Sequence, residues 1–172
     1  MAKSGRGELQ RSIVFVAFSG EEEGLYGSKA YVQELVERGT ASLMKGAVIM
    51  DQVGYSGPDD SQRNRAILET VGDQRPNNQL IDTMASTIEA SEFAKSHGYM
   101  VNYHGFGSDH IPFLESDLPA VLLIERGNMF YAHEFGHTSK DRASNINPEF
   151  GARMARLATD TIWSLATSKK DP

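Results

Sequence analysis

Apolar residues occur along this chain in two kinds of pattern, short runs and repeats at helical spacing. The runs end in polar or glycine residues and are too short for typical helices, so each predicts a β-strand. They cover residues 13–18, 47–53, 66–71 and 118–124. The run at 13–18 is apolar at every position and rich in β-branched and aromatic side chains, which is typical of a strand buried on both faces.

Two segments with helical spacing follow the first and third of these runs. Apolar residues predict a helix over residues 27–38, and Gly39 is its stop signal. A second helix is expected to carry the apolar positions of residues 80–88 on one face, with Asn77 or Asn78 as its cap.

The third helix has the strongest local signals. Asn147 is a suitable N-cap, Pro148 fits the first helical position, and an apolar stripe continues to Leu165. The remaining stretches are expected to be loops at residues 54–61, 97–107 and 125–145, with room for a short strand in 97–107 and a brief helical turn at 108–110.

Strands that alternate with helices predict an α/β fold. The 172 residues suit a single domain with a real core. We expect residues 1–11 to be a lead-in and residues 12–168 to be the core of that domain.

Composition and charge exclude several classes of function. The net charge is −6 with no compensating basic run, so nucleic acid is not expected as a partner. The absence of cysteine excludes disulfides, thiolate zinc sites and cysteine nucleophiles. The sequence has neither a signal-peptide core nor an apolar run approaching the ~20 residues of a membrane span, and it leaves the compartment open.

Carboxylates follow two of the predicted strands. Glu21, Glu22 and Glu23 come directly after the first run, and Asp51 lies within the second. The carboxyl ends of strands in an α/β sheet are the usual place for ligands. Two adjacent glutamates there can divide the work, one binding a metal and the other moving protons. A plainer interpretation is that the three glutamates favour the N-terminus of the following helix electrostatically.

The five histidines differ in their surroundings. His137 lies in a polar loop and is the best candidate for a ligand. For His110, which follows Asp109, a structural role has at least as much support as a catalytic one. For His97 and His104 we favour an ordinary structural or surface role.

Residues 133–137 also satisfy the H-E-x-x-H pattern, in which two histidines bind zinc and the glutamate acts as base. That mechanism would use His133, Glu134 and His137, and it requires a helix. Gly136 within the motif and the polar residues after it favour a loop instead.

Five segments of the chain, taken together, resemble the M28 family of di-zinc aminopeptidases. Residues 18–28 resemble its E-E-x-G-L-x-G-S signature, and residues 48–55 resemble its second metal-ligand strand. Residues 107–113 are similar to its G-S-D-H-x-x-F segment, and residues 118–122 to the strand that follows. Residues 137–141 resemble the H-T-x-x-D block.

This resemblance, which covers roughly residues 12–167, implies a three-layer α/β/α fold with a central mixed sheet, like other zinc exopeptidases. It implies a zinc-dependent aminopeptidase that removes N-terminal residues from a peptide substrate. Glu23 occupies a variable position of the signature and receives no role. The resemblance implies that Glu21 is the general base on a metal-bound water. Glu22 and His137 would be ligands of one zinc and Asp51 of the other. Asp109 and His110 would line the cleft or support the ligands.

The chain also departs from the family pattern. Members carry a histidine ligand in an H-x-D strand and a bridging aspartate in a G-A-x-D-N segment, both upstream of the glutamate pair. No histidine precedes His97 here, so we expect an N-terminally truncated domain that lacks these strands and has an incomplete set of ligands for one or two zinc ions.

Three functions therefore stay open: an aminopeptidase that needs the missing segment, a degenerate peptidase-like domain acting as a binding or structural module, and the H-E-x-x-H metalloprotease. A missing strand would also leave an apolar sheet edge near residues 13–18, so we expect self-association or strand exchange. Many members of the family are exported, but the resemblance does not fix the compartment of this chain.

Overall fold

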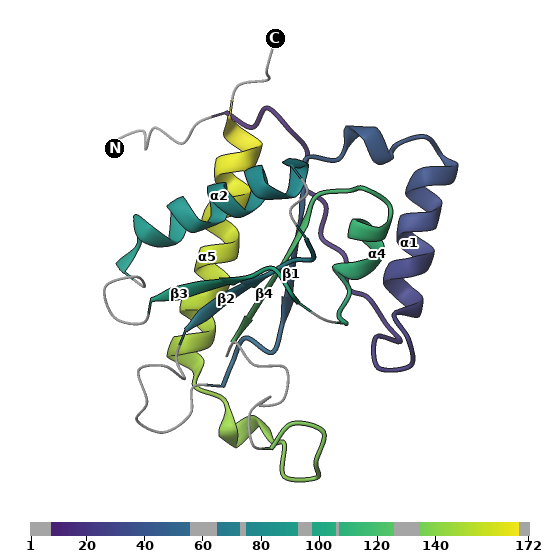
Figure 1. Ribbon diagram of the computed structural model, residues 1–172. Coiled ribbons are helices and arrows are strands. Elements are labelled where there is room, and N and C mark those ends of the chain that lie inside the picture. The colour runs from purple at the N-terminus through teal and green to yellow at the C-terminus, as the bar shows by residue number, and fades with distance from the viewer. Residues whose placement is uncertain are drawn as a thin grey trace.

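The computed structural model describes residues 8–55, 65–72, 75–92, 98–105, 107–125 and 135–168, with only the backbone described at 75–78. Figure 1 labels its helices and strands. In chain order the elements are α1 (Tyr26–Glu37), η1 (Ala41–Leu43), β1 (Ala47–Asp51), β2 (Ala66–Glu69), α2 (Arg75–Glu89), β3 (Tyr99–Asn102), α4 (Ile111–Glu115), β4 (Ala120–Glu125), η2 (Ala143–Asn145) and α5 (Pro148–Thr167).

The strands form one mixed sheet in the order β1-β4-β2-β3. β1 pairs parallel with β4, β4 pairs antiparallel with β2, and β2 pairs parallel with β3. The register places Asp51 beside Ile124 and Ala66 beside Glu125. The carboxyl ends of β1 and β4 therefore share one rim of the sheet, where the amino ends of β2 and β3 also lie.

Helices cover both faces of this sheet, because successive strand residues point to opposite sides. Val48 packs in a core with α2 and α5, whose buried members include Met84 and Met154. Its neighbours Ala47 and Ile49 pack instead in a second core with α1 and α4. Figure 1 shows α2 and α5 together on one side and α1 and α4 together on the other. The predicted three-layer α/β/α architecture with a mixed sheet is confirmed.

The last helix forms as its sequence predicts. Asn147 is the N-cap of α5, and its side chain accepts hydrogen bonds from the backbone N–H groups of Glu149 and Phe150, each 3.1 Å long. Pro148 occupies the first helical position, where no intrahelical N–H bond is lost. These local signals fix where the helix begins.

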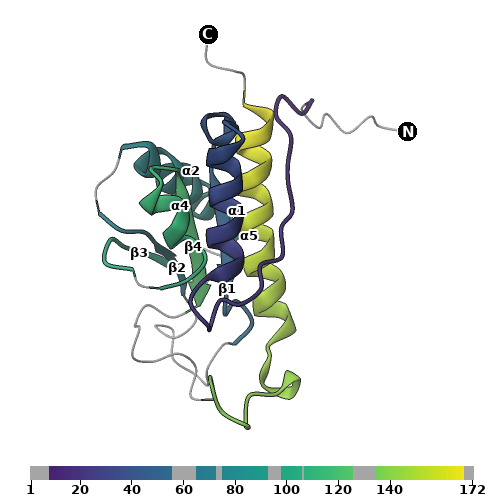
Figure 2. The ribbon, with the colours of Figure 1, turned by 90° about the vertical axis from the view of Figure 1, so that its right-hand side faces the viewer.

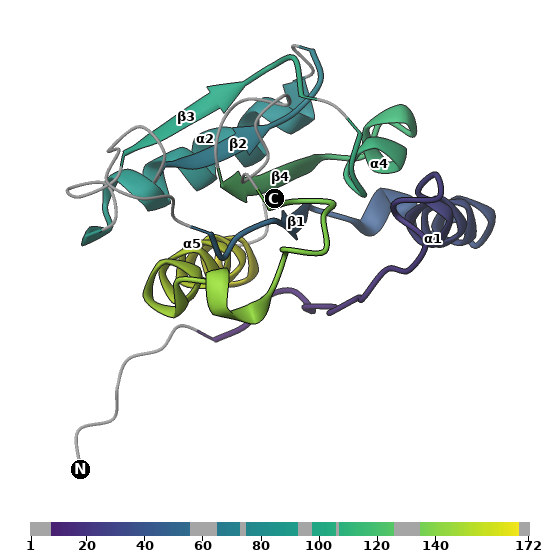
Figure 3. The same ribbon diagram turned by 90° about the horizontal axis from the view of Figure 1, so that it is seen from below.

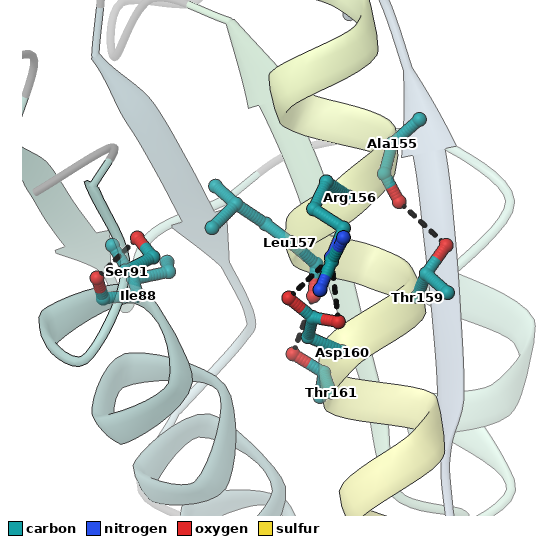
Figure 4. Close-up of polar contacts among 8 residues, drawn as sticks. All are labelled: Ile88, Ser91, Ala155, Arg156, Leu157, Thr159, Asp160 and Thr161. Carbon is teal, nitrogen blue, oxygen red and sulfur yellow. Dashed lines mark hydrogen bonds and ion pairs between the residues drawn. The ribbon is translucent and has the colours of Figure 1, made fainter. Parts of the chain in front are cut away.

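Threonine hydroxyl groups of α5 bond back to carbonyls of the preceding turn, as Figure 4 shows for Thr159 and Thr161. Thr161 is fully buried, and its Oγ1 donates to the carbonyl of Leu157 at 2.8 Å. Burying this hydroxyl therefore leaves no unmet hydrogen bond. On the exposed face of α5, the guanidinium of Arg156 contacts the carboxylate of Asp160 at 2.7 Å.

Several predicted boundaries needed correction. α2 begins at Arg75, so Asn77 and Asn78 lie inside this helix and are not its cap. The stretch expected to be mainly loop contains β3 (Tyr99–Asn102), and the expected helical turn becomes α4, with His110 at its N-cap position. Among the described residues, no helix is both long and apolar enough to cross a membrane.

The prediction of a buried strand at residues 13–18 is wrong. The segment is extended but joins no sheet, and Val14 and Phe15 are 70% and 88% exposed. A strand needs a neighbour of matching length, and the only described strand paired with β1 is β4, on its other edge. Figures 2 and 3 show the segment passing along the side of β1 away from β4, from the end of α5 to α1.

Both ends of this extended segment are attached to helices. At its start, the backbone N–H groups of Gln10 and Arg11 donate to the carbonyl of Ala166 in α5. At its end, the ring of Phe18 lies 5.7 Å from that of Tyr31 in α1 and joins the second core. The segment therefore leads from one helical layer to the other and places the glutamates before α1.

Candidate metal and catalytic site

The turn that carries the three glutamates has a tightly defined backbone. Gly24 and Leu25 adopt left-handed conformations with φ of 121° and 64°. A Cβ at Gly27 would lie 2.6 Å from the carbonyl oxygen of Ser19, which no real side chain tolerates. The glycines of the signature at residues 18–28 therefore allow the chain to fold back on the first turn of α1. A leucine in the left-handed region costs free energy, and such positions cluster at functional sites.

The structure brings Glu22 and His137 into contact although they are far apart in sequence. The Nε2 of His137 lies 2.9 Å from the Oε1 of Glu22, and both side chains are about two-thirds exposed, 70% and 67% respectively. His137 belongs to a turn in which Thr138 donates its N–H and its hydroxyl to the carbonyl of Phe135. This turn presents the imidazole to the glutamates.

The backbone of His137 is left-handed, with φ of 59°, so this residue cannot lie in an α-helix. The H-E-x-x-H mechanism needs His137 one helical turn after the first histidine of the motif. His133 and Glu134 lie outside the described residues. The conformation of His137 is therefore incompatible with a helical H-E-x-x-H zinc site.

Asp51 is held by a serine that the sequence analysis did not select. The Oγ of Ser108 donates to the Oδ2 of Asp51 at 2.9 Å, and Ser108 is almost fully buried. This hydrogen bond fixes the carboxylate at the end of β1 and leaves its Oδ1 available. Ser108 belongs to the same G-S-D-H segment as Asp109 and His110, and this motif is the signal that could have found it.

Glu21 is surrounded by negative charge. Partial burial raises the pKa of its carboxyl above the ordinary value, and the charges of Asp51, Glu22 and Asp109 raise it further, while His137 opposes them. The charges that shift this pKa include those of Glu22, Asp51 and His137, the three residues that the resemblance assigns to the metals. A carboxyl whose pKa is raised holds a proton more readily, which suits a general base.

Asp109 and His110 lie deeper in the protein than the glutamates. The Oδ1 of Asp109 is buried without a hydrogen-bond partner. His110 is fully buried with neither ring nitrogen bonded, and this burial lowers its pKa to about 4. His110 is therefore neutral at pH 7 and packs as a core residue.

Zinc requires three or four protein ligands around each ion. Among the described residues, no group of three or more histidines, aspartates and glutamates is arranged to hold a metal ion. Glu22 and His137 form one pair, and Asp51 is bonded to Ser108 instead. The described donors are the right chemical types for zinc, but they form an incomplete set.

The other histidines and carboxylates lie elsewhere. His104 forms a bridge with Val71 beyond the end of β2, and His97 lies outside the described residues. Glu69 and Glu125, the last residues of β2 and β4, are buried carboxylates that sequence reasoning missed. Glu69 accepts a hydrogen bond from the side chain of Asn102 at 2.9 Å, so its observed contacts are structural.

Comparisons with known proteins identify the family of this chain. The model of peptidase family M28 matches residues 1–162. A probable zinc metalloprotease of Pyrenophora tritici-repentis is 25% identical over 191 residues, covering 94% of this chain and 43% of that protein. The chain thus spans less than half of this relative.

Solved structures share the fold. The LapA aminopeptidase of Legionella pneumophila superposes with a TM-score of 0.76 at 25% identity, covering 98% of this chain and 43% of that one. BSAP, a zinc aminopeptidase from Bacillus subtilis, gives 0.74 at 25% identity, covering 91% and 36%. The family expected from the sequence motifs is confirmed, and this chain belongs to peptidase family M28.

Proposed function

We propose that this chain carries part of the active site of a metal-dependent aminopeptidase that hydrolyses N-terminal peptide bonds. Relatives of similar fold are named zinc aminopeptidases, but the chain spans only 36% of the length of one of them. The observation that carries the proposal is the grouping of Glu21, Glu22, Asp51 and His137 around one rim of the sheet.

In this proposal Glu21 is the general base. It accepts a proton from the attacking water and delivers it to the leaving amine. Partial burial and the charges of Asp51, Glu22 and Asp109 support this role, because they raise the pKa of Glu21 above its ordinary value. Glu21 does not bind the metal, so its oxygen atoms stay available for the proton.

Glu22 and His137 would bind one zinc ion, and Asp51 would bind a second. When bound, zinc lowers the pKa of a water molecule and polarises the carbonyl of the peptide. Ser108 orients Asp51 for this task through its hydrogen bond. Because the described donors are an incomplete set, the remaining ligands would come from outside them.

The test compares site variants with controls of the same residue types. Glu22→Ala and His137→Ala should each lower zinc content, measured by plasma emission spectroscopy after equilibration with zinc. Glu23→Ala and His104→Ala should retain the zinc content of the unaltered protein. Equal zinc content in all four variants would refute the assignment of the ligands.

A second test addresses the base. Glu21→Gln should keep zinc and lose hydrolysis of aminoacyl p-nitroanilides by at least about a hundredfold, as expected for general acid–base catalysis. Full activity in this variant would show that another group moves the proton.

The second candidate is a peptidase-like domain that binds a partner without catalysis. The incomplete donor set among the described residues favours it. A protein that binds no zinc and releases no amino-terminal residues would support this candidate over the enzyme. We also propose that the chain self-associates or exchanges strands through the exposed apolar side chains near residues 13–18.

A further inference from the structure

Glu125, the last residue of β4, is a buried carboxylate at the rim of the sheet where Asp51 lies. It is only 3% exposed, and it lies one position beyond Ile124, the partner of Asp51 in the strand register. Burying a carboxylate costs free energy unless hydrogen bonds satisfy its oxygen atoms. The hydrogen bonds of Glu125 therefore indicate the role of this carboxylate at the rim.

Glu125 holds both ends of the loop that follows β1, residues 52–55. Its backbone N–H donates to the carbonyl of Gln52 at 3.0 Å, and its Oε2 accepts a hydrogen bond from the backbone N–H of Tyr55. Gln52 has a left-handed backbone, with φ of 48°, so the chain bends directly after Asp51. A hydrogen bond from an N–H group to a carboxylate is stronger than one between neutral groups. These two bonds hold the bent loop against the end of β4.

The same loop contacts both ends of the segment that carries His137. At one end, the ring of Tyr55 lies 6.1 Å from that of Phe135 in an edge-to-face arrangement. The carbonyl of Phe135 accepts the hydrogen bonds that close the turn of His137. At the other end, the carbonyl of Gly54 accepts a hydrogen bond from the N–H of Asn147 at 2.8 Å. The loop thus connects the end of β1 to the segment of His137.

We propose that Glu125 is a positioning residue that sets the placement of His137 relative to Asp51. This inference rests on the proposed function, in which both residues bind zinc, and Glu125 itself would touch neither metal nor substrate. Asp51 directly precedes the loop that Glu125 holds, and the ring of Tyr55 in this loop packs on the residue that begins the turn of His137. Residues that orient metal ligands from behind contribute about 10–100-fold to metal affinity.

The first experiment measures local order in the absence of metal. Glu125→Leu removes the acceptor oxygens and keeps a side chain of similar size. Amide hydrogen exchange at Tyr55 and Thr138, followed by NMR, should become about tenfold faster in this variant, because one strong hydrogen bond is lost. Glu125→Gln keeps an acceptor oxygen and should stay closer to the unaltered protein. The matched control is Glu69→Leu, because Glu69 is also 3% exposed and ends β2, where it bonds to Asn102.

Equal exchange at Tyr55 in the two Glu125 variants, or the same acceleration in Glu69→Leu, would overturn the proposal. Equal acceleration of the amides in the middle of β4 would also overturn it, because that result indicates general destabilisation. If Glu125→Leu does not fold, Phe135→Leu provides the test. It removes the ring contact and should speed exchange at Thr138 while the amide of Tyr55 stays protected. Unchanged exchange at Thr138 in that variant would contradict the connection between the loop and the turn.

The second experiment connects this geometry to the proposed ligands. Competition with a chromogenic chelator measures the zinc dissociation constant, which should rise about 10–100-fold in Glu125→Leu and less in Glu125→Gln. Glu69→Leu should keep the constant of the unaltered protein. An unchanged constant in Glu125→Leu would show that Glu125 orders the loop without positioning the ligands, and would overturn the proposal. An unaltered protein that binds no zinc would instead refute the proposed ligands, and the exchange rates would still decide whether Glu125 positions the two segments.

Discussion

Four charged neighbours change the acidity of Glu21. Partial burial and three nearby carboxylates all disfavour its negative charge, so its pKa is raised. Glu23, one residue beyond Glu22 in the same turn, is not among these causes. Of these two neighbouring glutamates, therefore, only Glu22 adds to the raised pKa of Glu21.

We expect Asp109→Asn to lower the pKa of Glu21, because one of the repelling charges is removed. The measurement is a carbon-13 NMR titration of the Glu21 carboxyl group, which does not depend on activity. Glu23→Gln is the control and should leave that titration unchanged. A rise in the Glu21 pKa on removing Asp109 would contradict this electrostatic account.

His110 makes stability depend on pH. Its folded pKa of about 4 lies below the ordinary 6.5, so the unfolded chain binds a proton that the folded chain rejects. This contribution is fully present above pH 6.5 and is lost as the pH falls toward 4. Lowering the pH from about 7.5 to about 5 should remove about 2 kcal/mol of unfolding free energy through this residue.

The variant His110→Phe should abolish that part of the pH dependence, since neither ring nitrogen has a bond to lose. Urea unfolding at the two pH values measures it in the variant and in the unaltered protein. His104→Phe is the control, because His104 is exposed, and it should keep the full pH dependence. Identical pH dependence in His110→Phe and the unaltered protein would show that burial of this imidazole is not the cause.

At the scale of elements, the sequence predicted those features whose signals are local to the element. α5 could be predicted because Asn147, Pro148 and the apolar stripe are all local to the helix. The stretch at 13–18 has the composition of a buried strand, but burial requires a neighbouring strand on the correct side. Composition carries no information about that neighbour, so the run alone predicted a buried strand, and an exposed edge was expected only from the strands that the chain lacks relative to the family.

The candidate site likewise contains one contact that the sequence predicted and one that it did not. Motif resemblance predicted the grouping of Glu22 with His137, although no local pattern connects a turn before α1 with one before α5. The Ser108–Asp51 hydrogen bond was not predicted, because a serine in a loop has no spacing signal of its own. The bond forms because the fold brings the residues before α4 to the carboxyl end of β1.

The turn before α1 depends on a glycine, which gives a prediction about this element. Gly27→Ala should destabilise the protein by about 1–3 kcal/mol, because its Cβ would meet the backbone of Ser19 at 2.6 Å. Gly107→Ala is the control, since a Cβ there has no atom within 4 Å. Thermal unfolding compares the two variants, and equal melting temperatures would contradict the close approach.

At the scale of the whole molecule, one arginine connects the beginning of the described chain to its end. The Nη1 of Arg11 donates to the carbonyls of Leu165 and Ser168 at 2.6 and 2.9 Å. These carbonyls belong to the end of α5, where helices have unpaired acceptors and partial negative charge. Arg11 therefore stabilises the C-terminus of the helix and holds the extended segment in place.

We expect Arg11→Ala to loosen the last turn of α5 without unfolding the protein. Hydrogen exchange should become faster for the amides of Ala166 and Thr167, while the amides of β4 exchange as before. Arg38→Ala is the control, because Arg38 pairs only with the exposed Glu34 one turn earlier in α1. Unchanged exchange in α5 would mean that the backbone hydrogen bonds of α5 hold its last turn without help from the Arg11 side chain.

The mixed direction of the sheet separates two ends of the molecule. β1 and β4 point their carboxyl ends to the rim with Asp51, whereas β2 and β3 point theirs to the opposite rim, near Tyr103. Tyr103 is 44% exposed, and the chain contains no natural thiol. A cysteine at Tyr103 would thus be a unique handle for attaching the protein to a sensor surface, with the carboxylate-lined rim facing the solution.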